Sequence, residues 1–146
     1  MIPQYGEGFE GEGANVAHIN SVLGLRDGPV GQAWATSLAT PSAGHTRFVV
    51  VRQPNQPILP MTVFVNKATI DSDRHAALTW GAVQRGIVTG VDRAVNDGVI
   101  RGNLHRLALI IAVWVDPKAD DADSLEINND IATYRALIQG AAPFET

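Results

Sequence analysis

Residues 62–70, which read Thr-Val-Phe-Val-Asn-Lys-Ala-Thr-Ile, constrain the fold of this chain more than any other stretch. Their β-branched and aromatic character predicts a strand, yet polar side chains interrupt what would otherwise be a continuous apolar run. Because side chains alternate along a strand, Lys67 and Thr69 share one face, two residues apart. Two interpretations follow: an edge strand protected by a lysine, or a cation and a hydroxyl that line a small-molecule site.

Length, charge and cysteine content exclude several classes of function. At 146 residues and a formal net charge of -4, the chain has no basic cluster to neutralise phosphates, so we expect no nucleic-acid partner. It contains no cysteine, which excludes disulfides and thiolate metal sites. The first residues do not resemble a signal peptide, and the longest apolar run, residues 107–115, is too short to span a bilayer. We expect one cytoplasmic domain over residues 1–146, with no membrane contact.

Residues 6–11 match the G-x-G-x-x-G spacing of dinucleotide-binding loops. The expected context is missing, because no strand is predicted before the glycines and the acidic residues among them would repel a pyrophosphate. We therefore interpret residues 1–13 as a flexible lead-in to the domain.

Three further strands are predicted from the hydrophobic pattern. Residues 15–24 alternate so that His18 and Asn20 lie side by side on one face. Residues 45–51 form a second strand, and residues 107–115 are apolar enough to be buried on both faces of a sheet. A histidine taken alone is more often structural than catalytic, so this pairing leaves the function open.

Helices are predicted at three places between and after these strands. Pro29 suits the first turn of one helix, and Asp71 or Ser72 caps a second, longer one. A third follows the acidic residues 120–123. Its inward stripe is expected to consist of Ile127, Ile131, Tyr134 and Ile138. This order of elements predicts an α+β fold with a mixed sheet and helices packed on it.

Common catalytic and metal-binding templates do not match this chain. The histidines stand apart, without the H-x-H or H-E-x-x-H spacing that holds a metal, so we expect no metal site. They are His18, His45, His75 and His105. A G-x-S-x-G motif and a thiol nucleophile are also absent from the sequence. Motif spacing alone therefore indicates an α+β domain but does not indicate its function.

Four motifs, in one order, nevertheless resemble a known family. They are Gly-Ala-Asn-Val-Ala-His-Ile at 13–19, Gln-Pro-Asn at 53–55 with prolines at 57 and 60, Asn-Lys-Ala-Thr-Ile at 66–70, and Trp-Gly-Ala-Val-Gln at 80–84. Together they resemble the formaldehyde-activating enzymes of one-carbon metabolism and formaldehyde detoxification. The resemblance implies a carbon-oxygen lyase that condenses formaldehyde with tetrahydromethanopterin, its co-substrate, without metal. It also implies a homopentamer and a fold like the second domain of ribosomal protein S5.

The resemblance further implies roles for six residues. His18 takes the place of the catalytic histidine, the general acid that protonates the leaving oxygen. The substrate-binding positions are Asn20, Val49, Lys67, Thr69 and Gln84. Four places depart from the family pattern. Asn20 stands where the family has aspartate, and Arg85 where it often has histidine. The pair at 58–59 is less polar than usual, and residues 101–106 replace an acidic connection. Neutral Asn20 cannot favour an imidazolium by charge attraction as a carboxylate does.

These observations leave three functions open. The first is condensation of formaldehyde with a reduced pterin such as tetrahydromethanopterin, with His18 as general acid. The second is a non-catalytic sensor or carrier that binds a pterin, a folate or a one-carbon unit on the same scaffold. The third is a structural oligomer that has lost the pocket. For the assembly we expect a homopentamer with its pocket near the subunit boundary, because residues 107–115 and the pair at 58–59 offer much apolar surface.

Overall fold

The structure is a computed structural model that describes residues 1–40 and 42–143. Its centre is a five-stranded mixed sheet with the spatial order β1-β2-β7-β6-β3. Neighbouring strands run antiparallel except β7 and β6, which are parallel. These strands are β1 (Gln4–Glu10), β2 (Ala17–Leu25), β3 (Phe48–Val49), β6 (Met61–Asn66) and β7 (Leu107–Trp114). A second, two-stranded sheet consists of β4 (Val51–Gln53) and β5 (Gln56–Pro57).

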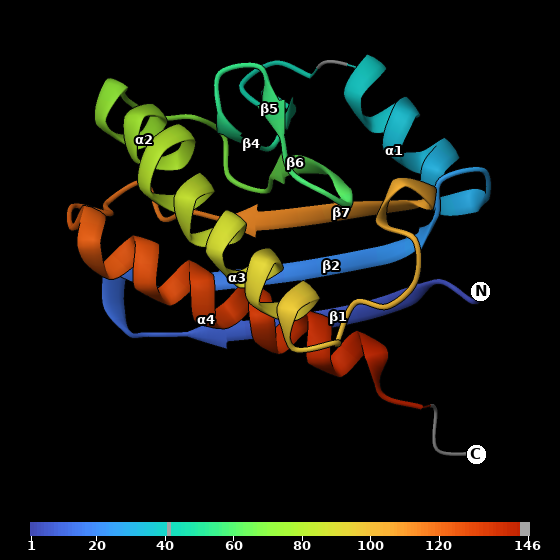
Figure 1. The fold of residues 1–146 in the computed structure, drawn as a ribbon. Helices are drawn as coiled ribbons and strands as arrows, with labels where there is room; N and C mark the ends of the chain where they lie inside the picture. The colour runs from blue at the N-terminus through green and yellow to red at the C-terminus, as the bar shows by residue number, and fades with distance from the viewer. Residues whose placement is uncertain (41, 144–146) are drawn as a thin grey trace.

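In the described residues, four α-helices pack around this sheet (Figure 1). They are α1 (Pro29–Ala39), α2 (Asp73–Leu78), α3 (Gln84–Asn96) and α4 (Ala122–Ala141), with a π-helical turn (Thr79–Val83) between α2 and α3 and 3₁₀ turns at Gly13–Asn15 and Leu104–Arg106. α4 lies along β1 and β2, and α3 lies along α4 (Figure 1). The predicted α+β class, a mixed sheet with helices packed on it, is confirmed. Among the described residues, no helix combines the length and the apolar character needed to cross a membrane.

The core lies between the sheet and the helices α3 and α4. Alternate residues of β2 and β7 point into it and are almost completely buried. They include Ala17, Ile19 and Leu23 of β2 and Leu109, Ile111 and Val113 of β7. This alternation is what the sequence predicted for β2.

The other side of the sheet is called the open face here. It carries Tyr5, Glu7 and Phe9 of β1, His18 and Asn20 of β2, and Ala112 and Trp114 of β7. α1 covers one end of this face, where Val30 fills the space beside Gly24. The side chain of Trp114 remains 36% exposed, so the expectation that residues 107–115 are buried on both faces is corrected. The reason is that the helices leave part of the open face uncovered.

The flexible lead-in expected at residues 1–13 is also corrected, because residues 4–10 form β1, which pairs with residues 17–23 of β2. Glycines at alternate positions explain this strand. A Cβ on Gly6 would come within 1.8 Å of the Ala136 carbonyl oxygen, and one on Gly8 within 1.8 Å of the Ala132 carbonyl oxygen. β1 therefore lies directly against α4, at a distance that only glycine permits.

The buried side of α4 differs from the predicted stripe for the same reason. Ile127 and Ile138 are 58% and 44% exposed, whereas Ala132 and Ala136 are fully buried. Small residues face β1 because the glycine-bearing strand and the helix backbone meet so closely. On its other side, α4 is approached by Gly86 and Gly90 of α3, whose Cβ positions would collide with α4 carbonyl oxygens.

The strand predicted over residues 62–70 ends at Asn66 in the structure. It lies between β7 and β3, so the interpretation of Lys67 as the guard of an edge strand loses its basis. The Lys67 N–H still donates to the Val113 carbonyl, 2.8 Å away, which continues the pairing with β7 by one residue. Thr69 lies beyond the strand and is exposed.

Candidate functional site

The open face brings a histidine and a carboxylate together across two strands. His18 of β2 is directly opposite Phe9 of β1, and Glu7 is opposite Asn20. Glu7 therefore reaches diagonally across the pair, and its Oε1 lies 2.8 Å from His18 Nε2. The Phe9 ring packs edge-on against the imidazole, with the ring centroids 5.9 Å apart. The imidazole is thus held from one side and remains partly exposed.

A lysine and an amide form the second contact of this site. Lys67 follows the end of β6, and its ammonium donates a hydrogen bond to Asn20 Oδ1. Partial burial lowers the pKa of Lys67, while the negative charge of Glu7 acts in the opposite direction. Asn20 is also opposite Ala112 of β7, which is opposite Val65 of β6. The strand positions between Asn20 and Lys67 are therefore occupied by small and apolar residues.

We call Glu7, His18, Asn20 and Lys67 the open-face cluster. It combines a group that can donate a proton near neutral pH, a cation, an amide and a carboxylate. All four come from three strands or their ends, which gives them rigid backbone positions. This arrangement suits general acid catalysis on a polar small molecule, with binding groups beside the acid.

The structure groups three of the six predicted site residues and leaves three elsewhere. His18, Asn20 and Lys67 belong to the open-face cluster. Val49 of β3 is opposite Val63, four residues before Lys67, which amounts to about 13 Å along the strand. Thr69 makes its hydrogen bond with His45 Nε2, at 3.1 Å.

Gln84 is the last predicted residue, and both polar atoms of its side-chain amide form hydrogen bonds within the protein. Its amide oxygen accepts from the Val51 N–H at 3.0 Å, and its amide nitrogen donates to the Trp80 carbonyl at 2.7 Å. The hydrogen bond to Trp80 connects the start of α3 to the π-helical turn. Short π-helical segments are frequent at functional sites. Gln84 therefore contacts the backbone two residues after Val49, apart from the open-face cluster.

Glu7, the carboxylate of the cluster, was not predicted from the sequence. Its signal was present in residues 4–10, where glycines alternate with Tyr5, Glu7 and Phe9. Such alternation indicates a strand with one face pressed against another backbone and the other face available. The match to a phosphate-binding loop obscured this pattern.

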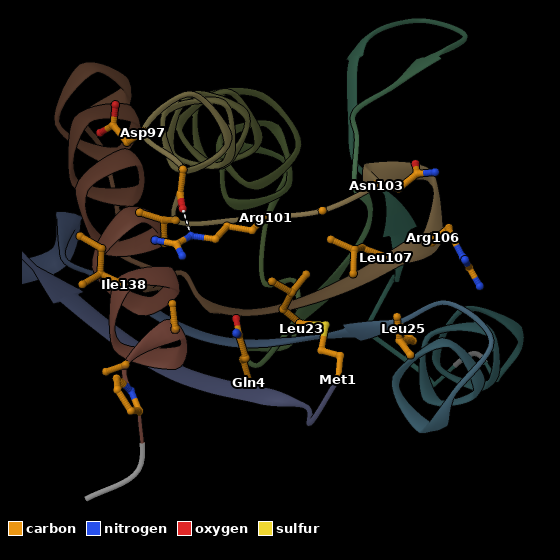
Figure 2. Close-up of a pocket in the computed structure, with 16 residues that line it drawn as sticks. Met1, Gln4, Leu23, Leu25, Asp97, Arg101, Asn103, Arg106, Leu107 and Ile138 are labelled. Carbon is orange, nitrogen blue, oxygen red and sulfur yellow. Dashed lines mark hydrogen bonds between the residues drawn. The ribbon is translucent and has the colours of Figure 1, made fainter.

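A large cavity lies elsewhere in the molecule (Figure 2). It measures about 1170 Å³ and lies between the ends of β2 and α4 and the segment that joins α3 to β7. Leu23 and Leu107 line it, and Arg101 lies beside them with its Nε hydrogen-bonded to the Gly98 carbonyl (Figure 2). His18 stands at the opposite end of β2, so this cavity is separate from the open-face cluster.

No group of three or more histidine, cysteine, aspartate or glutamate side chains suited to a metal ion occurs within residues 1–40 and 42–143.

Comparison with known proteins gives a family for this geometry. Residues 5–144 match the family described as formaldehyde-activating enzyme (Fae). The bifunctional enzyme Fae/Hps of Methanosarcina mazei is 35% identical over 135 residues, covering 92% of this chain and 34% of the relative. That of Methanothrix thermoacetophila is 37% identical over 133 residues, covering 90% and 34%. The chain thus spans about a third of the length of these relatives. The chain belongs to the formaldehyde-activating enzyme family.

Proposed function

We propose that this protein condenses formaldehyde with tetrahydromethanopterin to give methylene-tetrahydromethanopterin and water. The reaction joins the aldehyde carbon to two amine nitrogens and releases the aldehyde oxygen as water, the chemistry of a carbon-oxygen lyase. Membership of the family supports the reaction class. One observation carries the proposal to this chain: the His18 imidazole is partly exposed and is held 2.8 Å from a carboxylate.

The step that needs catalysis is the loss of oxygen from the first adduct. An amine adds to formaldehyde readily and gives a carbinolamine, whose C–O bond must then break. Protonation of the oxygen lets it leave as water, and the nitrogen lone pair forms the iminium ion that the second amine attacks. His18 is the proton donor, since imidazole is partly protonated near neutral pH. A positioned acid contributes roughly 10²- to 10⁴-fold to such a step.

Lys67 and Asn20 provide the binding groups in this proposal. The Lys67 ammonium offers hydrogen bonds to a carbonyl or a ring nitrogen of the pterin, and the Asn20 amide offers both a donor and an acceptor. The two side chains bond to each other, so a pterin bound here exchanges that contact for its own contacts with them. Lys67 is partly desolvated, which strengthens a hydrogen bond that it makes to a ligand.

Val49, Thr69 and Gln84 complete the proposed pterin site through assembly. Within one chain, Val49 is about 13 Å along the sheet from Lys67, too far for one small contact surface. In a homopentamer with the pocket at the subunit boundary, Val49 of one copy and Lys67 of a neighbouring copy come together. We also propose a cytoplasmic location, where a reduced pterin is protected from oxidation.

The test compares the rate of methylene-tetrahydromethanopterin formation with the uncatalysed condensation of the same reactants. We expect the protein to exceed the uncatalysed rate and His18→Ala to lose about 10² or more of that excess. His105→Ala is the matched control, since His105 lies in the exposed turn before β7. A wild-type rate no higher than the uncatalysed rate contradicts the proposal.

A second candidate function is that of a non-catalytic protein that binds a pterin, a folate or a one-carbon unit. It is favoured by Asn20, because a neutral amide at this position bonds Lys67 without adding charge next to His18. Calorimetry and thermal shift with tetrahydromethanopterin and tetrahydrofolate separate the candidates. Binding without turnover selects the binding protein, whereas no binding of either compound selects a structural oligomer.

A further inference from the structure

We infer that Glu7 is a positioning residue for this reaction, the carboxylate that orients the His18 ring and favours its protonated form. The inference rests on the proposed function and deepens it. It also answers the difficulty raised by Asn20, since the negative charge is supplied from the neighbouring strand. Glu7 acts through His18, and the imidazole touches the substrate.

The backbone around Glu7 is held in place by α4. Gly6 and Gly8, on either side, lie against the carbonyl oxygens of Ala136 and Ala132, at positions that leave no room for a Cβ, so β1 packs backbone to backbone on α4. The Glu7 N–H donates to Gln139 Oε1 at 2.6 Å. With its backbone anchored on both sides, Glu7 can direct its side chain only toward the open face.

The contact also determines which ring nitrogen delivers the proton. Nε2 lies 2.8 Å from Glu7 Oε1, so the carboxylate accepts from Nε2–H, and in the neutral ring Nδ1 is then the unprotonated nitrogen. Nδ1 makes no hydrogen bond within the described part of the chain. In the protonated ring, Nδ1–H donates to the carbinolamine oxygen and the C–O bond breaks with its electron pair on oxygen. Water leaves, the positive charge passes to the iminium, and His18 becomes neutral. Its Nε2–H keeps the hydrogen bond to Glu7.

The charges around His18 are few. On the open face Glu7 comes from β1 and Lys67 follows β6, while Trp114 of β7 and Phe9 of β1 are uncharged. Tyr5 lies two residues before Glu7 on the same face, and no residue of α1 carries a charge. Glu7 is therefore the negative group among these neighbours, and it opposes the positive charge of Lys67.

A merely structural ion pair predicts a different result from the one inferred here. The His18 and Glu7 side chains are 32% and 59% exposed, and pairs at such sites contribute little to stability. Removal of Glu7 should therefore leave the fold standing. Its effect should appear in the pH profile of the reaction, which stability alone does not move.

The experiment measures the catalysed rate between about pH 6 and pH 9 for the wild type, Glu7→Gln and Glu10→Gln. Glu10 is the matched control, because it lies on the same strand and pairs with Arg135. In Glu7→Gln we expect kcat to fall roughly three- to tenfold at the high end, with the falling limb moved to lower pH. At the low end, where the imidazole is protonated without help, the rate should approach that of the wild type.

The outcomes separate this inference from the function on which it rests. A wild type without catalysed turnover defeats the proposed function. A wild type with turnover whose pH profile and kcat are unchanged in Glu7→Gln overturns only the role of Glu7. That role is also overturned if the variant loses an equal factor at every pH, because protonation of His18 is then not what Glu7 supports.

Discussion

The Lys67 ammonium is placed where a ligand can compete for it. It donates a hydrogen bond to Asn20 Oδ1. Partial burial lowers the pKa of Lys67, and the negative charge of Glu7 acts in the opposite direction. The surrounding strand positions are apolar or small, so few other groups can take over a hydrogen bond that this residue makes. Substitutions in the open-face cluster should therefore affect binding and rate more than stability.

Lys67→Ala should weaken the binding of tetrahydromethanopterin by roughly 1.5–3 kcal/mol, the usual contribution of a hydrogen bond from a charged donor. Urea unfolding should show little change, because the strand backbone keeps its bond to Val113. Calorimetric titration measures the affinity, and Lys118→Ala, at an exposed turn, is the control. Unchanged affinity together with aggregation of the variant would restore the interpretation of Lys67 as a lysine that protects an edge strand.

Asn20→Asp tests the departure from the family. The new carboxylate can keep the contact with Lys67 and adds a negative charge on the strand face of His18, so condensation should accelerate at high pH. The falling limb of the rate profile should move to higher pH, and His18→Ala in the same background should remove the gain. The gain should be larger in Glu7→Gln than in the wild type, since one carboxylate then replaces another.

One outcome of the Asn20→Asp experiment would contradict catalysis by this chain. If Asn20→Asp binds the pterin but shows no rate above the uncatalysed reaction, with or without His18, catalysis is not a property of this chain. The binding-protein function then replaces it. Measurement of the uncatalysed rate under the same conditions is essential, because formaldehyde and reduced pterins condense without an enzyme.

At the scale of elements, β1 packs backbone to backbone on α4. Two glycines of the strand meet carbonyl oxygens of the helix, and two glycines of α3 meet the same helix from another direction. α4 is thus enclosed by backbone as much as by side chains, which leaves little room for adjustment. The position of Glu7 depends on this packing.

Gly8→Ala should destabilise the protein by roughly 1–3 kcal/mol or more, because its Cβ would overlap the Ala132 carbonyl oxygen and β1 would have to move. The variant should also lose catalysed rate through displacement of Glu7. Gly81→Ala is the matched control, since its Cβ would meet only the flexible end of Arg85, 3.4 Å away. Urea unfolding that finds the two variants equally stable would show that β1 is not packed on α4 as described.

At the scale of the whole molecule, the open face presents large exposed aromatic side chains. Tyr5 is 64% exposed and Phe9 58%, and both lie beside the open-face cluster. The apolar pair at 58–59 contributes less than expected, because Ile58 is buried and only Leu59 reaches the surface. The open face is thus the surface most suited to contact another copy.

We predict a homopentamer in solution, with the open-face cluster at or near the subunit boundary. Burial of Tyr5 and Phe9 supplies part of the association energy, so Phe9→Glu should shift the assembly toward monomers. Light scattering measures the mass at micromolar concentration, and Ile127→Glu, a substitution at an exposed residue of α4, is the control. A monomer mass for the wild type would contradict the assembly and weaken the proposed site of Val49 and Gln84.

The sequence by itself determined part of the local structure and the family. Alternation predicted β2 and placed His18 beside Asn20, and Ser72 caps α2 through the His75 N–H as expected. The motifs at 13–19, 53–60, 66–70 and 80–84 were sufficient to indicate formaldehyde-activating enzymes, which the comparison confirmed. Such features depend on neighbours within a few residues, and periodicity reports them directly.

Only the tertiary structure decided which elements meet. It joined Glu7 to His18, selected the alanine side of α4 over its isoleucines, and separated Val49 and Gln84 from the open-face cluster. Periodicity shows which residues share a face, but it does not show which strand lies alongside or which helix covers that face. Those choices follow from close packing between segments more than a hundred residues apart, as where Glu7 meets Gln139.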